Sequence, residues 1–254
     1  MAMNLGLIKR EPVAVAAFDF GAAGEVYREI LEAQEETGGT VTYRAKIPSG
    51  GGKAFEILTG NEDTDTSVPM IEGVIIKSHK ANAYWSENAS MSDPPTCSSM
   101  DGIEGTDRET GECRDCEDCP FNKFGTANGG TKPGKACKNM IRLYIMTEGN
   151  PIPLILALPP TSIKAWQNYR VSVLATQGLK PTDAVTQITL TPTVSKAGDK
   201  YSLVKFRLGG RLNDDQRAVA RMFAQGFAPS VELSGDDYNV PKEAENDAGE
   251  RAAE

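Results

Sequence analysis

The sequence predicts a mainly β protein with few helices, built as one small antiparallel barrel that carries insertions. Segments rich in β-branched and aromatic residues come in pairs separated by short turn sequences, only three segments have helical spacing, and the strand–helix alternation typical of parallel sheets is missing. The 254 residues are enough for one sizeable core. We expect that domain over residues 1–230 and a disordered acidic tail over residues 231–254.

The first part of the chain contains one expected helix and three expected strands. Residues 22–36 place apolar side chains at helical spacing among good helix formers. Residues 40–48 and 53–60 read as two strands joined by a flexible glycine-rich loop. Residues 71–85 are rich in β-branched and aromatic residues and alternate over part of their length, which predicts one bent strand or two consecutive ones.

The later part of the chain contains two further strand pairs and two helices. Each strand pair flanks a turn sequence, Gly149-Asn150 in the first and Lys196-Ala197-Gly198-Asp199 in the second. Each helix follows a capping residue of the Ser, Thr or Asn type. The expected strands are 140–148, 151–159, 184–194 and 200–208, and the expected helices are 161–175 and 213–225.

Charge is distributed unevenly along the chain. The formal net charge is -8, but residues 120–211 hold thirteen Lys or Arg against three acids, a balance of +10. Residues 93–119 carry -7 and residues 231–254 carry -6. The global charge therefore hides a strongly basic middle between two acidic segments.

Five cysteines lie within a polar, Gly/Pro-rich stretch that we delimit as residues 93–140. A loop of this length in a compact domain needs something to order it. Overlapping CxxC spacings with a single cysteine on either side are typical of a closed structural zinc site with four thiolate ligands. We expect Cys97, Cys116, Cys119 and Cys137 as ligands, since Cys119-Pro120 matches the usual end of such a turn, with Cys113 as the alternative ligand. A ligand role for His79 and an iron–sulfur cluster are the competing interpretations.

The basic middle of the chain also contains interleaved aromatic residues. A groove that holds single-stranded nucleic acid combines cations along the phosphates with aromatic faces on which bases stack. The candidate residues are Lys77, Lys80, Tyr84, Trp85, Phe121, Lys123, Phe124, Lys132, Lys135, Lys138, Arg142, Tyr144, Lys205 and Arg207. The structural alternative for the aromatic members is that they are core residues.

Signals of catalysis, export and membrane insertion are scarce. The run Ser49–Ala54 lacks the upstream glycine and the final Ser or Thr of a phosphate-binding loop, and the common hydrolase and dinucleotide motifs do not occur. Asp19 breaks the second apolar run of the N-terminus, so a secretory leader is not expected, and no apolar run has the length of a membrane span. We therefore expect a non-enzymatic protein of the host-cell cytoplasm with no membrane partner.

Seven runs within residues 70–215 resemble a family of phage and prophage single-stranded-DNA-binding proteins. They are GVIIKSHKANAYW, PPTCSSMDG, CEDCPFNKFGTA, GKACKNMIRLYI, LALPPTSIKAWQNY, AVTQITL and YSLVKFRLGGRL. The resemblance implies an oligonucleotide-binding (OB) barrel, in some members with a zinc loop, followed by an acidic tail. The tail here lacks the terminal aromatic residue of some relatives, and Cys113 is an additional thiol.

Taken together, these patterns predict a sequence-nonspecific single-stranded-DNA-binding protein of replication or recombination with a structural Zn²⁺. Its expected partners are single-stranded DNA, replication or recombination proteins recruited by the acidic tail, and other copies of itself on DNA. Two alternatives belong to other classes. One is an interaction protein, such as a defence inhibitor, whose acidic segments imitate nucleic acid, and the other is a metal-dependent nuclease accessory.

Overall fold

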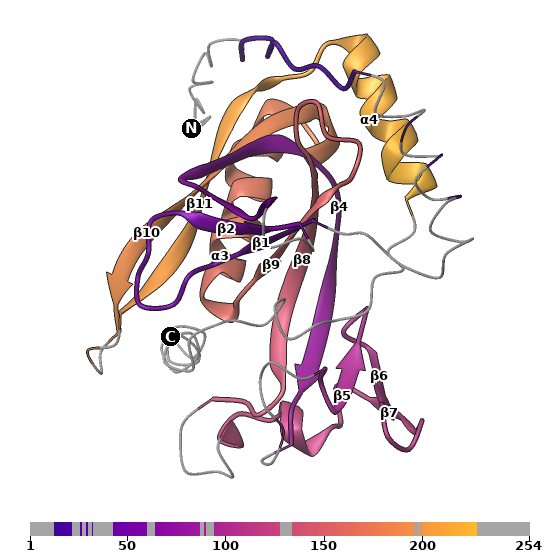
Figure 1. The fold of residues 1–254 in the computed structure, drawn as a ribbon, viewed down its shortest axis with the longest axis vertical. Coiled ribbons are helices and arrows are strands. Elements are labelled where there is room, and N and C mark those ends of the chain that lie inside the picture. Colours follow the sequence, from indigo (N-terminus) through magenta and orange to yellow (C-terminus); the bar gives the residue numbers. More distant parts are fainter. Residues whose placement is uncertain are drawn as a thin grey trace, which may run out of the picture.

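The computed structural model describes residues 13–21, 43–59, 64–86, 94–127, 134–195 and 200–227, together with residues 26, 29, 32, 89 and 198. These residues form a mainly β protein, as expected, with eleven strands in one sheet (Figure 1). The described helices are all too short or too polar to cross a membrane.

The central strand of the sheet is β4 (Met70–Tyr84), so of the two possibilities expected there, one bent strand or two consecutive ones, the structure has the single strand. It pairs antiparallel with β10 (Ala184–Val194) near its start, with β8 (Lys138–Met146) over most of its length and with β5 (Cys97–Ser99) at its end. The register of β4 against β8 shifts after Ile75, which marks a bulge. One strand thus belongs both to the main body of the protein and to the cysteine region, residues 93–140.

The remaining long strands form hairpins on either side of β4. β8 turns into β9 (Leu154–Leu158), and β10 turns into β11 (Lys200–Arg211). On the far edge of β9 lies β1 (Tyr43–Lys46), which runs parallel to β9 and forms a hairpin with β2 (Phe55–Leu58). A short strand, β3 (Thr66–Val68), extends this edge.

The sheet is mixed and is not closed by strand pairing within the described residues, which differs from the antiparallel barrel expected from the sequence. The edge of β9 that could accept β11 is taken by β1. The loop of the β1–β2 hairpin reaches β11 instead, where the Ser202 hydroxyl donates to the Gly52 carbonyl over 2.7 Å. The gap between β9 and β11 is therefore bridged by a loop and by side chains rather than by a ladder.

One face of the sheet packs around α3 (Pro160–Asn168), whose Trp166 is fully buried. Inward-facing residues of β4, β8 and β11, such as Ile75, Leu143 and Val204, surround this helix. The helix continues as a π-helical turn, so the expected helix over residues 161–175 is confirmed in position but irregular in its second half. This cluster is the main hydrophobic core.

The other face of β4 and β8 is also covered, by α4 (Asp214–Gly226) and by residues 18–20. Alternate residues of β8, including Tyr144 and Met146, pack there with Phe20 and Phe223. Because both of its faces are buried, β8 has almost no solvent-exposed side.

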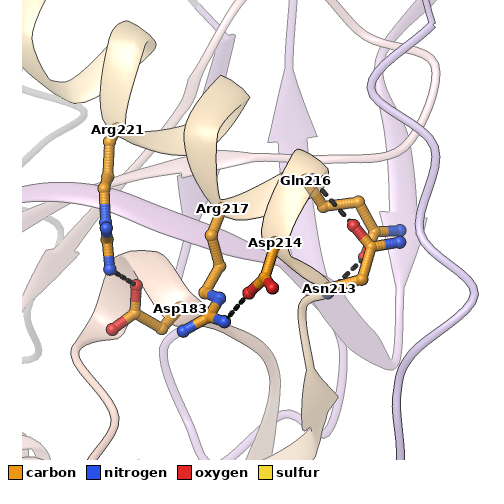
Figure 2. A network of polar contacts seen from close by, with 6 residues as sticks. All are labelled: Asp183, Asn213, Asp214, Gln216, Arg217 and Arg221. Carbon is orange, nitrogen blue, oxygen red and sulfur yellow. Dashed lines mark hydrogen bonds and ion pairs between the residues drawn. The ribbon is translucent and has the colours of Figure 1, made fainter.

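Polar contacts fix α4 at its first half (Figure 2). Asn213 and Gln216 form a reciprocal capping box, with both bonds 2.8 Å long. Arg221 pairs with the carboxylate of Asp183 at 2.9 Å, and that carboxylate also accepts the Lys180 amide N–H. The helix expected over residues 213–225 is confirmed, including its Asn cap.

Figure 1 shows the cysteine region projecting from the far end of β4 and β8, away from α4. This region was expected to lack regular structure, but it contains β5, β6 (Glu104–Asp107), β7 (Cys113–Asp115) and a short 3₁₀ turn, η2 (Pro120–Asn122). These strands continue the main sheet beyond β4. The expected helix at 22–36 falls mostly, and the acidic tail at 231–254 entirely, outside the described residues.

Candidate metal centre and nucleic-acid interface

Four thiols from three separate segments line one cavity at the end of β4. Cys97 begins β5, Cys116 follows β7, Cys119 precedes η2, and Cys137 precedes β8. The cavity is completed by polar and aromatic neighbours that include Tyr84 and Phe121. The four cysteines expected to act as ligands are thus brought together, although they are spread over 41 residues of sequence.

Gly105 on β6 leaves room for two of these thiols. A Cβ atom at this position would lie 3.1 Å from Cys97 Sγ and 3.5 Å from Cys116 Sγ. The first distance is shorter than an ordinary contact, so a larger residue would displace the sulfur. The missing side chain therefore lets the two sulfurs approach the strand, as a thiolate site requires.

The thiols also influence one another electrostatically. Burial, with smaller contributions from the three neighbouring thiols, raises the pKa of Cys137 to about 12. Burial likewise raises the pKa of Cys97, with additional contributions from Cys119 and Cys116. Thiolates gathered in one cavity repel one another unless a cation compensates their charge, and a metal ion is the usual one.

No three His, Cys, Asp or Glu side chains in the described ranges are already arranged to hold a metal ion. The four thiols nevertheless line one cavity, and Gly105 faces two of their sulfurs. A Cys₄ set fits zinc in donor type and number.

Cys113 lies apart from this cavity. It is exposed on β7, opposite Thr106 in the register, and its Sγ is 3.7 Å from the Thr106 hydroxyl. Thr106 and its neighbour Gly105 point to opposite faces of β6, and Gly105 is the one that faces the thiols. The geometry therefore favours the ligand set that excludes Cys113.

His79, the only histidine, points elsewhere. Its Nε2 lies 3.0 Å from the Tyr144 hydroxyl and its Nδ1 lies 2.7 Å from the Lys80 carbonyl. Since a carbonyl can only accept, Nδ1 carries the proton and Nε2 accepts from the tyrosine. Burial lowers the pKa of His79, which agrees with this neutral form. With both ring nitrogens engaged away from the thiols, His79 is not placed to replace a cysteine ligand.

Two acidic residues of the β5–β7 ribbon stabilise its turns. The Asp101 carboxylate accepts from the amides of Ile103 and Glu104, and the Asp107 carboxylate accepts from the amides two and three residues further on. The hydrogen bond from the Ile103 backbone N–H lowers the pKa of Asp101, and the hydrogen bond from the Thr110 backbone N–H lowers the pKa of Asp107. These two carboxylates thus have a role in turn formation.

The second half of the cysteine region is tied to the first by the Asn122 side chain. Its Nδ2 donates to the Cys116 carbonyl over 2.6 Å, and its Oδ1 accepts from Lys135 Nζ at 3.1 Å. Lys123 Nζ donates to the Glu117 carbonyl at 2.5 Å. Two of the cations expected to contact nucleic acid are therefore anchored on the cysteine region itself.

The expected nucleic-acid-binding residues differ widely in exposure. Arg142, Tyr144 and Trp85 are buried, so in this arrangement they offer no surface to a strand. Tyr84 and Phe121 are partly buried and stack on each other, with ring centroids 4.1 Å apart. Lys132 lies outside the described residues. The exposed members are Lys80, Lys123, Phe124, Lys205 and Arg207, and the partly buried cations are Lys77, Lys135 and Lys138.

These residues fall into two groups rather than one. Arg207 on β11 donates to Gln187 on β10, which in turn contacts Glu72 near the start of β4. Lys80 stands eight residues further along β4, toward the cysteine region, a separation of roughly 26 Å at the rise of an extended strand. The cations of the cysteine region and those of β11 therefore lie at different ends of the molecule.

Comparisons of the chain with known protein families, with curated proteins and with solved structures found no match.

Proposed function

We propose that the chain binds single-stranded DNA without sequence specificity, as an OB-type protein with a structural zinc ion in its first long loop. The observation that supports this most is the connectivity of five strands. In chain order they are β4, β8, β9, β10 and β11, their pairing runs β9-β8-β4-β10-β11, and α3 lies between the third and fourth. That order and helix position are those of an OB barrel, except for the pairing that would close it.

The loops that bind oligonucleotides in an OB-fold correspond to two segments of this chain. Oligonucleotides contact the loop between the first two strands, the loop between the last two, and the neighbouring sheet face. Here the first loop is the cysteine region, whose basic half follows Cys119, and the last is the turn between β10 and β11. Exposed Lys205 and Arg207 lie on one face of β11 itself. The two separated groups of cations therefore correspond to the first loop and to a sheet face.

The metal completes the proposal. Zinc held by Cys97, Cys116, Cys119 and Cys137 would clamp three segments that have few apolar contacts of their own. The role is structural, since a set of four thiolates leaves no open position for a reacting water. The same proposal includes cytoplasmic action, assembly of several copies along DNA and recruitment of replication or recombination proteins by residues 231–254.

A titration with a labelled single-stranded oligonucleotide at several salt concentrations tests this function. Affinity should fall steeply with salt, with a logarithmic slope of about 0.7 per neutralised phosphate. The oligonucleotide should stay intact when Mg²⁺ is added, which separates binding from nuclease activity. Absence of binding at low salt would refute the proposal and would favour the alternative of a protein-binding, nucleic-acid-mimicking chain.

A further inference from the structure

The cysteine region exposes one aromatic ring, Phe124, that stacks on no other aromatic side chain of the described residues. Its side chain is 56% exposed, in contrast to the buried Trp85 and Tyr144. The other two aromatic candidates, Tyr84 and Phe121, stack at an interplanar angle of 12°, so each covers one face of the other, and both are partly buried. Phe124 is thus the most exposed ring of this set.

We propose that Phe124 is the residue on which an unpaired base stacks, and that the metal-bound cysteine cluster holds this ring in its binding position. This inference rests on the proposed function and adds to it a specific contact and a role for the metal in binding. The occupant is an unpaired nucleobase of a polyanionic strand.

The loop that presents Phe124 is held by many hydrogen bonds. The Gly134 carbonyl accepts from three consecutive amides, those of Gly125, Thr126 and Ala127, at 2.7, 3.1 and 3.3 Å. The Thr126 hydroxyl lies 2.7 Å from the Lys123 carbonyl and also accepts the Ala136 amide at 3.0 Å. An exposed ring on such a loop loses little conformational freedom when a ligand binds, which favours affinity.

The same loop is joined directly to two of the proposed ligands. The Cys137 amide donates to the Phe121 carbonyl over 2.8 Å, and the Asn122 amide donates to the Cys119 carbonyl over 3.0 Å. Phe124 follows Cys119 by five residues and is separated from it only by η2 and Lys123. Loss of the metal would free both ends of this short segment, because few buried apolar side chains hold it.

The charge around Phe124 identifies the kind of ligand. From Cys119 to Thr147 the sequence contains no Asp or Glu, whereas Lys123 and Lys135 hold their ammonium groups on the same loop. Each lysine uses one of its three N–H donors in the contact described above, so two remain for a phosphate. A cationic surface around one exposed ring fits a phosphate backbone with accessible bases. In a duplex the base faces are already stacked and are not accessible.

The test is a binding comparison of the full chain with F124A, F124W and a control, I103A. Ile103 is another exposed apolar residue of the cysteine region, 66% exposed, but it lies in the acidic ribbon. Removal of one base–aromatic contact should weaken binding of a labelled oligothymidine about tenfold. F124W and I103A should bind like the unmodified chain, and F124A should leave the salt slope unchanged because phenylalanine carries no charge.

Two further arms examine the role of the metal and the kind of strand. Removal of zinc with a chelator should weaken binding at least as much as F124A, and F124A should then cause no further loss, because the ring has already lost its position. Binding to duplex DNA should not change in F124A. Zinc content, measured for every variant, should be the same for F124A and the unmodified chain.

Each part can be overturned separately. If the unmodified chain binds and F124A binds equally well, Phe124 does not stack on bases, while the proposed function stands. If F124A still costs tenfold after zinc removal, the metal does not position the ring. If the unmodified chain binds no oligonucleotide, the proposed function and this inference fall together.

Discussion

Gly105→Ala should weaken zinc binding by the cysteine region without lowering the stability of the metal-free protein. Gly105 lies in β6 and its φ is not positive, so alanine fits the backbone there. Without metal, the substitution should leave stability unchanged or raise it by about 0.5 kcal/mol, since glycine loses more conformational entropy in a strand. The metal-free protein should therefore not be harmed.

The expected effect on metal binding has the opposite sign. The new Cβ would be 3.1 Å from Cys97 Sγ and must push that sulfur away by a few tenths of an ångström. Zinc–sulfur bonds of about 2.3 Å tolerate deviations of only about 0.2 Å. We expect zinc affinity to fall roughly 10- to 100-fold, as for other changes next to metal ligands.

Competition with a chromophoric chelator measures this affinity, and thermal unfolding with and without chelator measures the two stabilities. Gly111→Ala is the matched control: Gly111 has φ +72°, and a Cβ there would meet no described atom within 4 Å, so alanine strains the backbone without touching a thiol. It should lower stability by about 1 kcal/mol and leave zinc affinity unchanged. Equal zinc affinity of Gly105→Ala and the unmodified chain would refute convergence of the thiols beside β6.

Three further outcomes are expected. Cys119→Ser should abolish binding of zinc, about one ion per chain, and loosen residues 97–137 while the main sheet stays folded, whereas Cys113→Ser should keep the metal. Metal analysis measures the zinc content, and hydrogen exchange measures the loosening. Deletion of residues 231–254 should increase the affinity for single-stranded DNA at low salt, because a tethered segment of charge -6 competes with the phosphates, and this gain should shrink as the salt concentration rises. An unchanged affinity at every salt concentration would speak against such competition. Asp183→Ala should lower the free energy of unfolding by about 1–2 kcal/mol in a denaturant titration, since this buried carboxylate caps a turn and pairs with Arg221. In the same titration Asp214→Ala, at a side chain 89% exposed, should lower it by less than about 0.5 kcal/mol.

Local patterns predicted the hairpins and the C-terminal helix well. The alternation of residues 184–194 and 200–208 and the capping Asn213 each depend on neighbours in the sequence, and the structure confirms them. Three-residue strands such as β3 and β7 are too short to show a period, so they were missed. The parallel pairing of β1 with β9 joins segments more than a hundred residues apart, and no local signal specifies it.

The burial of Arg142 and Tyr144 shows where interpretation of the site from sequence failed. Both were expected to face nucleic acid because they are cationic or aromatic, but each lies on a strand with both faces covered. The run MIRLYIM is almost continuously apolar, which is typical of such a strand and could have indicated the burial. By contrast, the four cysteines preferred from the sequence do line one cavity, although spacing alone left Cys113 as an alternative.

The contact between Val15 and Arg211 determines how early in synthesis the segment around Val15 can fold. The residues beside Val15 exchange backbone hydrogen bonds with Arg211, and Phe20 stacks with Phe223 at a centroid distance of 6.2 Å. Nearly two hundred residues must therefore be synthesised between the emergence of the first partner and the second. At about 5–20 residues per second this takes roughly 10–40 s, during which Phe18 and Phe20 are exposed on the nascent chain. The segment around Val15 thus leaves the ribosome long before the strand with which it pairs.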